Sequence, residues 1–402
     1  MKIVEINGTN YAGTGNIVLN IAEKARLEGF EVFTCCKNSK KGKTYHYDNQ
    51  VFIGYRYERI ISEQLAMFTG CSDSFNFFGT KAFIKKLKEI KPDLIHLHVL
   101  HDTYVNHKLL FDYINKIDIP VVYTFHDCWP FTGKCPHFEL ANCYKWKNNC
   151  NKCPQLNRYP KILFDRTRCL FTRKKQMISN IKNLSIVAPS KWLHNYINQS
   201  FYKNINSQVI YNGIDLCKYH YVQSNILDNY KIENKKIVLG VANTWHINKG
   251  LDIFIELSKL LSSDYRIVLV GTDNSIDKQL PNNIVSIHRT HNINEMIELY
   301  SAADVFVNPT REEVFGLVNV EALSCGIPVV CFNTGGCAEI INDKCGVLVE
   351  RNDIESMKEE IENICENHPF NKQACINRAK EFDVNKMASE YIALYKKLLN
   401  IK

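Results

Sequence analysis

Residues 313–330 read Glu313-Val-Phe-Gly-Leu-Val-Asn-Val-Glu321-Ala-Leu-Ser-Cys-Gly-Ile-Pro-Val-Val330, a turn followed by a helix and then a strand. The Phe-Gly turn leaves backbone amides unpaired at the start of the helix, where the helix dipole favours an anionic group. Glu313 then lies beside that anion, and Glu321 follows about two turns along on the same side. A carboxylate beside a phosphate and a second within reach of a ribose predict a nucleotide-sugar site.

Short β-branched runs alternate with longer amphipathic segments along the rest of the chain, as in βαβ units with parallel sheets. We expect strands at Lys2–Asn7, Glu31–Cys35, Leu94–His98, Val121–His126 and Ser185–Ala188, and again at Lys236–Ala242, Tyr265–Gly271, Val285–Ile287, Val305–Val307 and Pro328–Phe332. The main helices are expected at Gly13–Arg26, Gly250–Leu261, Ile293–Ala302, Gly316–Cys325, Asp353–Glu366, Asn371–Glu381 and Val384–Leu399. This pattern predicts two doubly wound α/β domains, 1–205 and 206–383, with a strand and turn at 209–215 leading into the second and a final helix over 384–402.

The composition is that of an ordinary soluble protein, with 45% hydrophobic and 23% charged residues in 402. The first strand already carries Lys2 and Glu5, so we expect no signal peptide, and no apolar run approaches the roughly 18 residues of a membrane span. Sixteen cysteines without a secretion signal indicate a reducing cytoplasm, with thiols free or bound to metal.

The net charge of +8 is concentrated between Ala141 and Lys203, where Asp165 is the single acid among thirteen Lys and Arg residues. Such a bias favours an anionic partner, either lipid headgroups or a phosphorylated acceptor, over a merely solvated surface. We expect a peripheral position at the inner face of the cell membrane. No nucleic-acid-reading motif is present, so nucleic acid is not an expected partner.

Two features of the first half are candidates for ligand contact. The loop Gly8-Thr-Asn-Tyr-Ala-Gly13-Thr-Gly15-Asn16 follows the first strand and opens a helix, where Gly13 and Gly15 let the backbone approach an anion closely. His126 and Asp127 end an apolar strand, a position suited to substrate contact; the alternative is a structural histidine. In the second half, Lys249 precedes a helix and is placed to offset the charge of a departing diphosphate, unless it is an exposed turn lysine.

A cysteine-rich segment, within residues 128–154, has the spacing Cys135-x7-Cys143-x6-Cys150-x2-Cys153-Pro154. Four thiolates, with the last two at x2 spacing, match a structural Cys₄ zinc site. Reduced buried thiols and disulfides are the alternatives.

The sequence resembles the group 1, family 4 retaining glycosyltransferases of the GT-B fold. The resemblance rests on Lys249-Gly250, Ser301–Val307, Pro309, Glu313–Glu321, and Asn333-Thr-Gly-Gly336 with Glu339, and it covers essentially the whole chain. His126-Asp-Cys-Trp-Pro-Phe-Thr-Gly133 and the cysteines are similar to a bacterial branch that assembles surface polysaccharides such as capsule or lipopolysaccharide. The GT-B fold implies two Rossmann-like domains facing a central cleft, the first on the acceptor side, with the last helix crossing back to it.

The resemblance implies a role for each motif residue. Glu313 contacts the donor sugar, Glu321 the ribose, Lys249 the leaving group and His126 the transferred sugar. The remaining donor-binding positions are Gly13, Gly15, Thr290, His291, Phe315, Gly316, Leu317 and Val318. The implied enzyme is a retaining hexosyltransferase without a catalytic cofactor and without metal at the reaction centre. It uses a UDP- or GDP-sugar and a polysaccharide or undecaprenyl-linked acceptor.

One departure from the family pattern concerns the cation that usually accompanies the lysine. An arginine is expected about six residues earlier or in the same loop, but Asn243 and Asn248 stand here. Arg311, His246 and Arg289 are the candidates to replace it. The departure also keeps open a non-catalytic nucleotide-sugar or lipid-binding partner, and a sugar-nucleotide 2-epimerase shares the two-domain fold.

Overall fold

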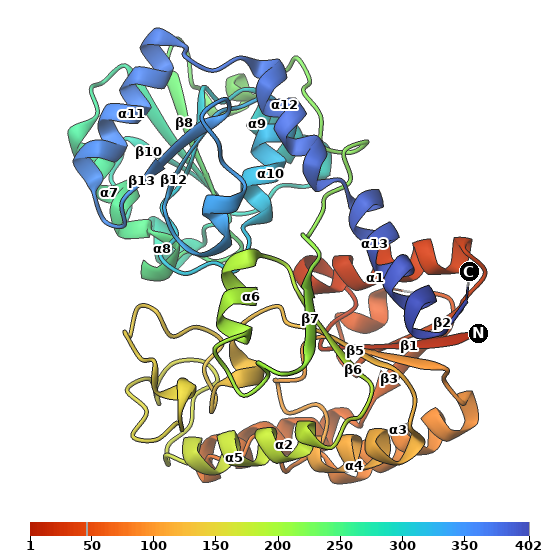
Figure 1. Cartoon of the computed structure of the whole chain (residues 1–402). Coiled ribbons are helices and arrows are strands. Elements are labelled where there is room, and N and C mark those ends of the chain that lie inside the picture. Colours follow the sequence, from red (N-terminus) through yellow and green to blue (C-terminus); the bar gives the residue numbers. More distant parts are fainter. Residues whose placement is uncertain (46, 402) are drawn as a thin grey trace. The chain divides into compact units, whose positions relative to one another are not determined.

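The computed structural model describes residues 1–45 and 47–401, and the chain divides into two compact units (Figure 1). The N-terminal unit comprises Met1–Tyr211 and the residues from Asn385 onward, and the C-terminal unit comprises Asn212–Val384. Strand β7 (Asn206–Val209) belongs to the N-terminal unit, whereas the sequence-based boundary at residue 206 assigns it to the second domain. Its residues are polar and partly exposed at the sheet edge, so no apolar pattern marks it as a strand.

A seven-stranded parallel sheet, in the order β3-β2-β1-β4-β5-β6-β7, forms the centre of the N-terminal unit. The other six strands are β1 (Lys2–Asn7), β2 (Glu31–Lys37), β3 (Gln50–Ile53), β4 (Leu94–Leu97), β5 (Val121–Thr124) and β6 (Leu184–Ala188). The helices are α1 (Ala12–Leu27), α2 (Arg56–Thr69), α3 (Phe77–Ile90), α4 (His107–Ile117), α5 (Thr167–Ser179) and α6 (Lys191–Ile197). Strands β4, β5 and β6 are buried along their whole length, as expected for parallel strands covered on both faces.

A six-stranded parallel sheet, in the order β10-β9-β8-β11-β12-β13, forms the centre of the C-terminal unit. Its strands are β8 (Lys236–Val241), β9 (Tyr265–Val270), β10 (Ile284–Ile287), β11 (Val305–Asn308), β12 (Val329–Phe332) and β13 (Gly346–Val349). Its helices are α7 (Leu251–Leu260), α8 (Asn274–Asp277), α9 (Ile293–Ser301), α10 (Leu317–Ser324), α11 (Ile354–Asn367) and α12 (Lys372–Ala379). Residues of α7 and α11 pack with the sheet into one apolar core.

Both sheets reverse their strand order at one point, between β1 and β4 in the N-terminal unit and between β8 and β11 in the C-terminal unit. In open parallel sheets the loops at the carboxyl ends of the strands on either side of such a reversal form the ligand crevice. The loops after β1, β4, β8 and β11 are therefore the places to look for function.

The last helix, α13 (Val384–Leu398), returns the chain to the N-terminal unit. Tyr391 and Tyr395 on this helix are buried and hydrogen-bond to Thr124 and His96. The prediction of two doubly wound α/β domains, with a final helix crossing back to the first, is confirmed. The strand expected at 209–215 is not formed as such: its residues run irregularly beyond β7, and Ile214 makes an isolated bridge to Asp383.

Candidate active site

The candidate active site lies at the carboxyl edge of the sheet of the C-terminal unit. Strands β8, β11 and β12 are neighbours there, and the loops that follow them carry Lys249, Glu313 and Gly335. Because β8 and β11 flank the reversal of strand order, Lys249 and Glu313 meet at the position where α/β sheets bind ligands.

Lys249 and Glu313 form an ion pair, with 2.6 Å between Nζ and Oε2. The lysine ends a short 3-10 helix, Ile247–Lys249, and the left-handed Gly250 (φ 76°) then turns the chain into α7. Burial lowers the pKa of Lys249, but the Glu313 carboxylate outweighs it and the net shift is upward. The site therefore holds a permanently charged ammonium group next to a carboxylate.

The loop after β12 holds the Glu313 loop in place. A Cβ on Gly335, whose φ is 55°, would lie 1.7 Å from the Glu313 carbonyl oxygen, so only glycine fits. The amide of Gly336 donates to the same oxygen at 3.2 Å, and Thr334 Oγ1 donates to the Thr310 carbonyl at 2.8 Å. This explains in physical terms why position 335, after β12, is a glycine.

Arg311, one of the candidate replacement cations, is committed to another role. Its guanidinium forms a bidentate pair with Asp252, both contacts at 2.7 Å, and its Nε donates to Asn352 at 2.7 Å. Asn248, which stands at a possible arginine position, donates to Glu312 at 2.9 Å. These contacts tie the Glu313 loop to the start of α7, where Arg311 pairs with Asp252.

Glu321 lies on α10, where two tyrosines hold its carboxylate. Tyr300 donates to Oε2 at 2.9 Å, and Tyr219 also hydrogen-bonds to the carboxylate. Burial raises the pKa of Glu321, and the two tyrosine hydroxyls partly offset that shift. These two contacts hold the Glu321 side chain in one orientation.

The start of α10 has the features predicted for an anion site. Gly316 is the N-cap with φ 89°, and no side chain caps the helix there. Leu317 and Val318 open the helix and are half-buried, whereas the Phe315 ring is buried against Phe382 with 5.5 Å between ring centroids. Phe315 therefore has a packing role besides its place in the turn.

Thr290 and His291 lie in the loop after β10, the edge strand of the same sheet. Strand β9 separates β10 from β8, and no described contact joins these two residues to Lys249, Glu313 or Glu321. Their role in binding the donor stays a prediction.

In the N-terminal unit, His126 follows β5 and Gly13 and Gly15 lie at the start of α1. His126 Nε2 lies 3.0 Å from His98 Nδ1, and burial lowers the pKa of His126 to about 3, so the ring is neutral. Gly13 has φ 41° and is exposed, and Gly15 is buried against Asn10. Asp127 accepts from His101 Nε2 at 2.9 Å and so faces that histidine.

The four cysteines of the predicted metal site, Cys135, Cys143, Cys150 and Cys153, line one pocket together with Thr132, Gly133 and Trp146. The Sγ atoms of Cys135 and Cys153 are 3.8 Å apart, and the Gly133 amide donates to the Cys150 sulfur at 3.2 Å. All sixteen cysteines are free thiols, so the disulfide alternative does not hold in this structure.

Of the thirteen basic residues between Ala141 and Lys203, twelve are exposed, and Lys174 is the exception. Lys174 is buried, and its ammonium donates to the carbonyls of Trp129 and Thr132 at 2.6 and 2.9 Å. Lys134 is likewise buried and donates to Gln155 and Arg158 carbonyls. Lys174, on α5, thus ties the cysteine-rich segment to a helix of the unit, and Lys134, inside the segment, joins it to the residues that follow.

Sequence reasoning missed Glu5, His96, His98 and Tyr300 as parts of the sites. The signal for the histidines was present: His96-Leu-His98 ends the strand β4, next to the reversal of strand order. No comparable pattern marks Tyr300, because a tyrosine on the buried face of a helix usually serves packing alone.

Two family models match the sequence. The model of Glycosyltransferase Family 4 matches residues 11–218, and that of Glycosyl transferases group 1 matches residues 222–382. The chain belongs to glycosyltransferase family 4.

The individual relatives share less than a third of their residues with this chain in the aligned regions. WcaC of Escherichia coli K12, assigned to colanic acid biosynthesis, is 24% identical over 65% of this chain and 65% of its own length. An N,N'-diacetylbacillosaminyl-diphospho-undecaprenol N-acetylgalactosaminyltransferase of Campylobacter jejuni is 29% identical over 46% of this chain and 53% of its own. The chain thus spans less than two thirds of the length of either.

Among solved structures, HepE from Anabaena in complex with UDP-glucose has a TM-score of 0.70 at 16% identity, covering 99% of this chain and 100% of HepE. That likeness confirms the GT-B fold class. Among the described residues, none of the helices has the length and apolar character needed to cross a bilayer.

Proposed function

We propose that this chain is a retaining hexosyltransferase that moves a sugar from a UDP- or GDP-sugar to a polysaccharide or lipid-linked acceptor in bacterial surface-glycan synthesis. The observation that carries the proposal is the Lys249–Glu313 pair, 2.6 Å apart at the reversal of strand order. Family membership supports it, as do two relatives: WcaC, named for colanic acid biosynthesis, and the Campylobacter transferase, named for an undecaprenol-linked acceptor.

In this proposal each group has a task in the reaction. Glu321, fixed by Tyr300, accepts hydrogen bonds from the ribose hydroxyls, and the uncapped start of α10 binds the diphosphate. Glu313 holds the donor sugar, and the Lys249 ammonium offsets the charge that develops on the diphosphate.

Bond formation and cleavage then take place on one face of the sugar. The bond from the anomeric carbon to the diphosphate breaks as the acceptor oxygen attacks from the same side, and the leaving phosphate takes the acceptor proton. The protein supplies positioning and charge stabilisation, which together are worth several kcal/mol of barrier. We expect turnover that does not depend on added Mg²⁺ or Mn²⁺.

Product analysis without acceptor separates the alternatives. A 2-epimerase converts the sugar nucleotide into its epimer, whereas the transferase at most hydrolyses it slowly. A non-catalytic binding partner would bind nucleotide, and its Glu313→Ala and Lys249→Ala variants would leave the cellular glycan unchanged.

We also propose that the four cysteines hold a structural zinc ion. In a tetrahedral site with Zn–S distances of about 2.3 Å, neighbouring sulfurs lie about 3.8 Å apart. The Cys135–Cys153 separation of 3.8 Å fits one edge of such a site, and the Gly133 N–H···S contact to Cys150 is a suitable outer hydrogen bond. Metal analysis of the purified protein tests the assignment: about one zinc per chain supports it, and none refutes it.

We further propose that the protein binds an anionic membrane surface on the cytoplasmic side. One face of α2 exposes Tyr57, Ile61, Leu65 and Phe68, which follow one another at helical spacing. Glu58 accepts from the amides of Phe78 and Gly79, so the exposed Phe77 and Phe78 of α3 adjoin this face. Lys81 covers the Phe77 ring at 4.2 Å, which combines the positive charge and the apolar surface that lipid headgroups attract.

Sedimentation with vesicles tests this surface. Binding to vesicles containing phosphatidylglycerol, but not to pure phosphatidylcholine, is expected for the wild type. Replacing Ile61 and Phe68 by Ser should abolish it without changing hydrolysis of a soluble donor, and undiminished binding of that variant would contradict the proposal.

A further inference from the structure

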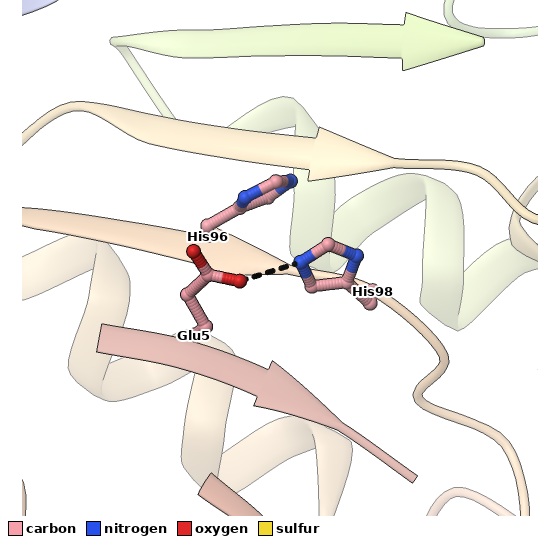
Figure 2. A group of neighbouring side chains, drawn as sticks. All are labelled: Glu5, His96 and His98. Atoms are coloured by element: carbon pink, nitrogen blue, oxygen red, sulfur yellow. Dashed lines mark ion pairs between the residues drawn. The ribbon is translucent and has the colours of Figure 1, made fainter. Parts of the chain in front are cut away.

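A buried line of polar contacts connects His126 with the interior of the N-terminal unit. His126 Nε2 lies 3.0 Å from His98 Nδ1, and His98 Nε2 lies 3.3 Å from Glu5 Oε2. Figure 2 shows Glu5 on β1 pointing at His98, with His96 beside them. Glu5 and His98 are buried, and among the described residues neither Glu5 Oε2 nor His98 Nε2 makes a hydrogen bond; the 3.3 Å contact between them is recorded as an ion pair. Each atom is therefore the partner available to the other.

The other carboxyl oxygen fixes the direction of the line. Tyr395 donates to Glu5 Oε1 at 3.2 Å and lies 2.5 Å from His96 Nδ1. We assign the single tyrosine proton to Glu5, and with that assignment His96 donates to the tyrosine oxygen from Nδ1. His96 Nε2 then accepts from Thr124, 2.8 Å away, whose oxygen accepts from Tyr391.

With Oε1 occupied as an acceptor, a neutral Glu5 carries its proton on Oε2. That proton is donated to His98 Nε2, so His98 carries its own proton on Nδ1 and donates it to His126 Nε2. His126 must then be protonated on Nδ1. This nitrogen has no hydrogen bond to any residue described in the structure, and the His126 ring is only half-buried.

We propose that Glu5 and His98 are positioning residues that fix the tautomer of His126, so that its Nδ1–H donates to an oxygen of the transferred sugar. The proposal rests on the proposed function, in which His126 contacts that sugar. Glu5 and His98 do not touch the ligand themselves.

The electrostatics agree with neutral members throughout the line. Burial raises the pKa of Glu5 to about 8, partly offset by Tyr395 and Arg26, and burial lowers the pKa of His98 to about 3. The charged or titratable groups that face the line from the surrounding elements are Arg26 on α1, Cys35 on β2, His96 on β4, Tyr391 and Tyr395 on α13, and His101 with Asp127 beside His126.

Loss of the Glu5 proton reverses the line. The Oε2 proton passes to His98 Nε2, the His98 Nδ1 proton passes to His126 Nε2, and the His126 Nδ1 proton leaves to water. Two protons are transferred between neighbouring groups, a third is released to water, and Glu5 becomes a carboxylate. His126 Nδ1 then carries a lone pair in place of a proton. As the pH rises through about 8, this nitrogen therefore changes from a hydrogen-bond donor to an acceptor toward the sugar.

A metal ion is the competing interpretation, because ligand atoms of Glu5, His96 and His98 lie within 4.8 Å of one another. Both ring nitrogens of His96 are already engaged, one by Tyr395 and the other by Thr124. A metal would have to break one of these buried hydrogen bonds, which favours the proton line.

The test is the tautomer of His126, measured by NMR on protein labelled with ¹⁵N-histidine and assigned with a His126→Phe variant. We expect Nδ1–H at about pH 6.5, and a fall of its share by roughly tenfold or more by about pH 9.5. In Glu5→Gln this pH dependence should vanish. Glu28→Gln, which removes an exposed carboxylate of the same unit, should keep it.

Several outcomes overturn the proposal. These are Nε2–H at about pH 6.5 in the wild type, a pH dependence that survives in Glu5→Gln, and Zn²⁺ shifting the His96 and His98 signals of the wild type but not of Glu5→Gln. The wild-type titration stands even where Glu5→Gln does not fold. If the His126 tautomer changes with pH but the protein transfers no sugar, the roles of Glu5 and His98 stand and the proposed function is wrong. In an active protein, kcat/KM for the donor should change through the same midpoint in the wild type alone.

Discussion

Replacing Lys249 by Met separates the catalytic role of the Lys249–Glu313 pair from its structural role. The two side chains are 32% and 25% exposed, so solvent screens their attraction despite the 2.6 Å contact. Loss of such a pair costs about 1 kcal/mol of folding stability, or roughly 2–4 °C in Tm. Loss of a cation that offsets charge on a leaving diphosphate raises the barrier by about 3–4 kcal/mol, which is a fall in kcat of roughly 10²–10³-fold.

The assay pairs nucleotide release with thermal unfolding. Lys259→Met is the matched control, since Lys259 lies in the same unit and pairs with Glu256 at 2.8 Å, but both side chains are largely exposed. We expect the control to keep full activity and nearly full stability. Equal activity of the two variants would refute the assignment of Lys249, as would a loss of turnover that unfolding of Lys249→Met accounts for.

Three further predictions follow from individual contacts. Tyr300→Phe removes the 2.9 Å hydrogen bond to Glu321. Because a hydrogen bond to a charged group is worth about 1.5–3 kcal/mol, we expect the nucleotide affinity, measured by calorimetry, to fall about tenfold. An unchanged affinity would count against the ribose role of Glu321. Cys153→Ser should lower Tm and zinc content while specific activity of the folded fraction is retained, whereas the exposed Cys217→Ser should change neither. The free energy of unfolding, from denaturant titrations, should fall as the pH drops from about 6.5 towards 3, because His98 and His126 stay neutral in the folded protein but take up protons when it unfolds. The raised pKa of Glu5 opposes this trend between about pH 4.5 and 8. A free energy that does not change below pH 6 would contradict the neutral state of the two histidines.

The fold was largely predictable because its determinants are local. Runs such as Lys236–Val241 and Val329–Phe332 are continuous, apolar and short, so their sequence alone marks them as buried parallel strands. The start of α10 was predictable for the same reason, because the glycine before the helix sets its N-terminus. The polar edge strand β7 was not, because pairing with β6 and not its own side chains makes it a strand.

The candidate site was predictable only in part. Glu313 and Lys249 are far apart in sequence, and the family resemblance implied a separate donor contact for each; their ion pair was not predicted, because it depends on the strand order that places their loops together. The commitment of Arg311 to Asp252 and the line from Glu5 through His98 to His126 are tertiary contacts between elements that no spacing rule connects. Such contacts depend on which strands become neighbours, and that information is not local.

The most direct test of the central claim is a turnover screen of purified protein against UDP-, GDP- and ADP-sugars, measuring nucleotide release with and without a crude lipid-linked acceptor. We predict that nucleotide is released from one donor, that the release increases with acceptor, and that it disappears in Glu313→Ala. Nucleotide binding without release from any donor in the presence of acceptor, or release that persists in Glu313→Ala, would contradict it.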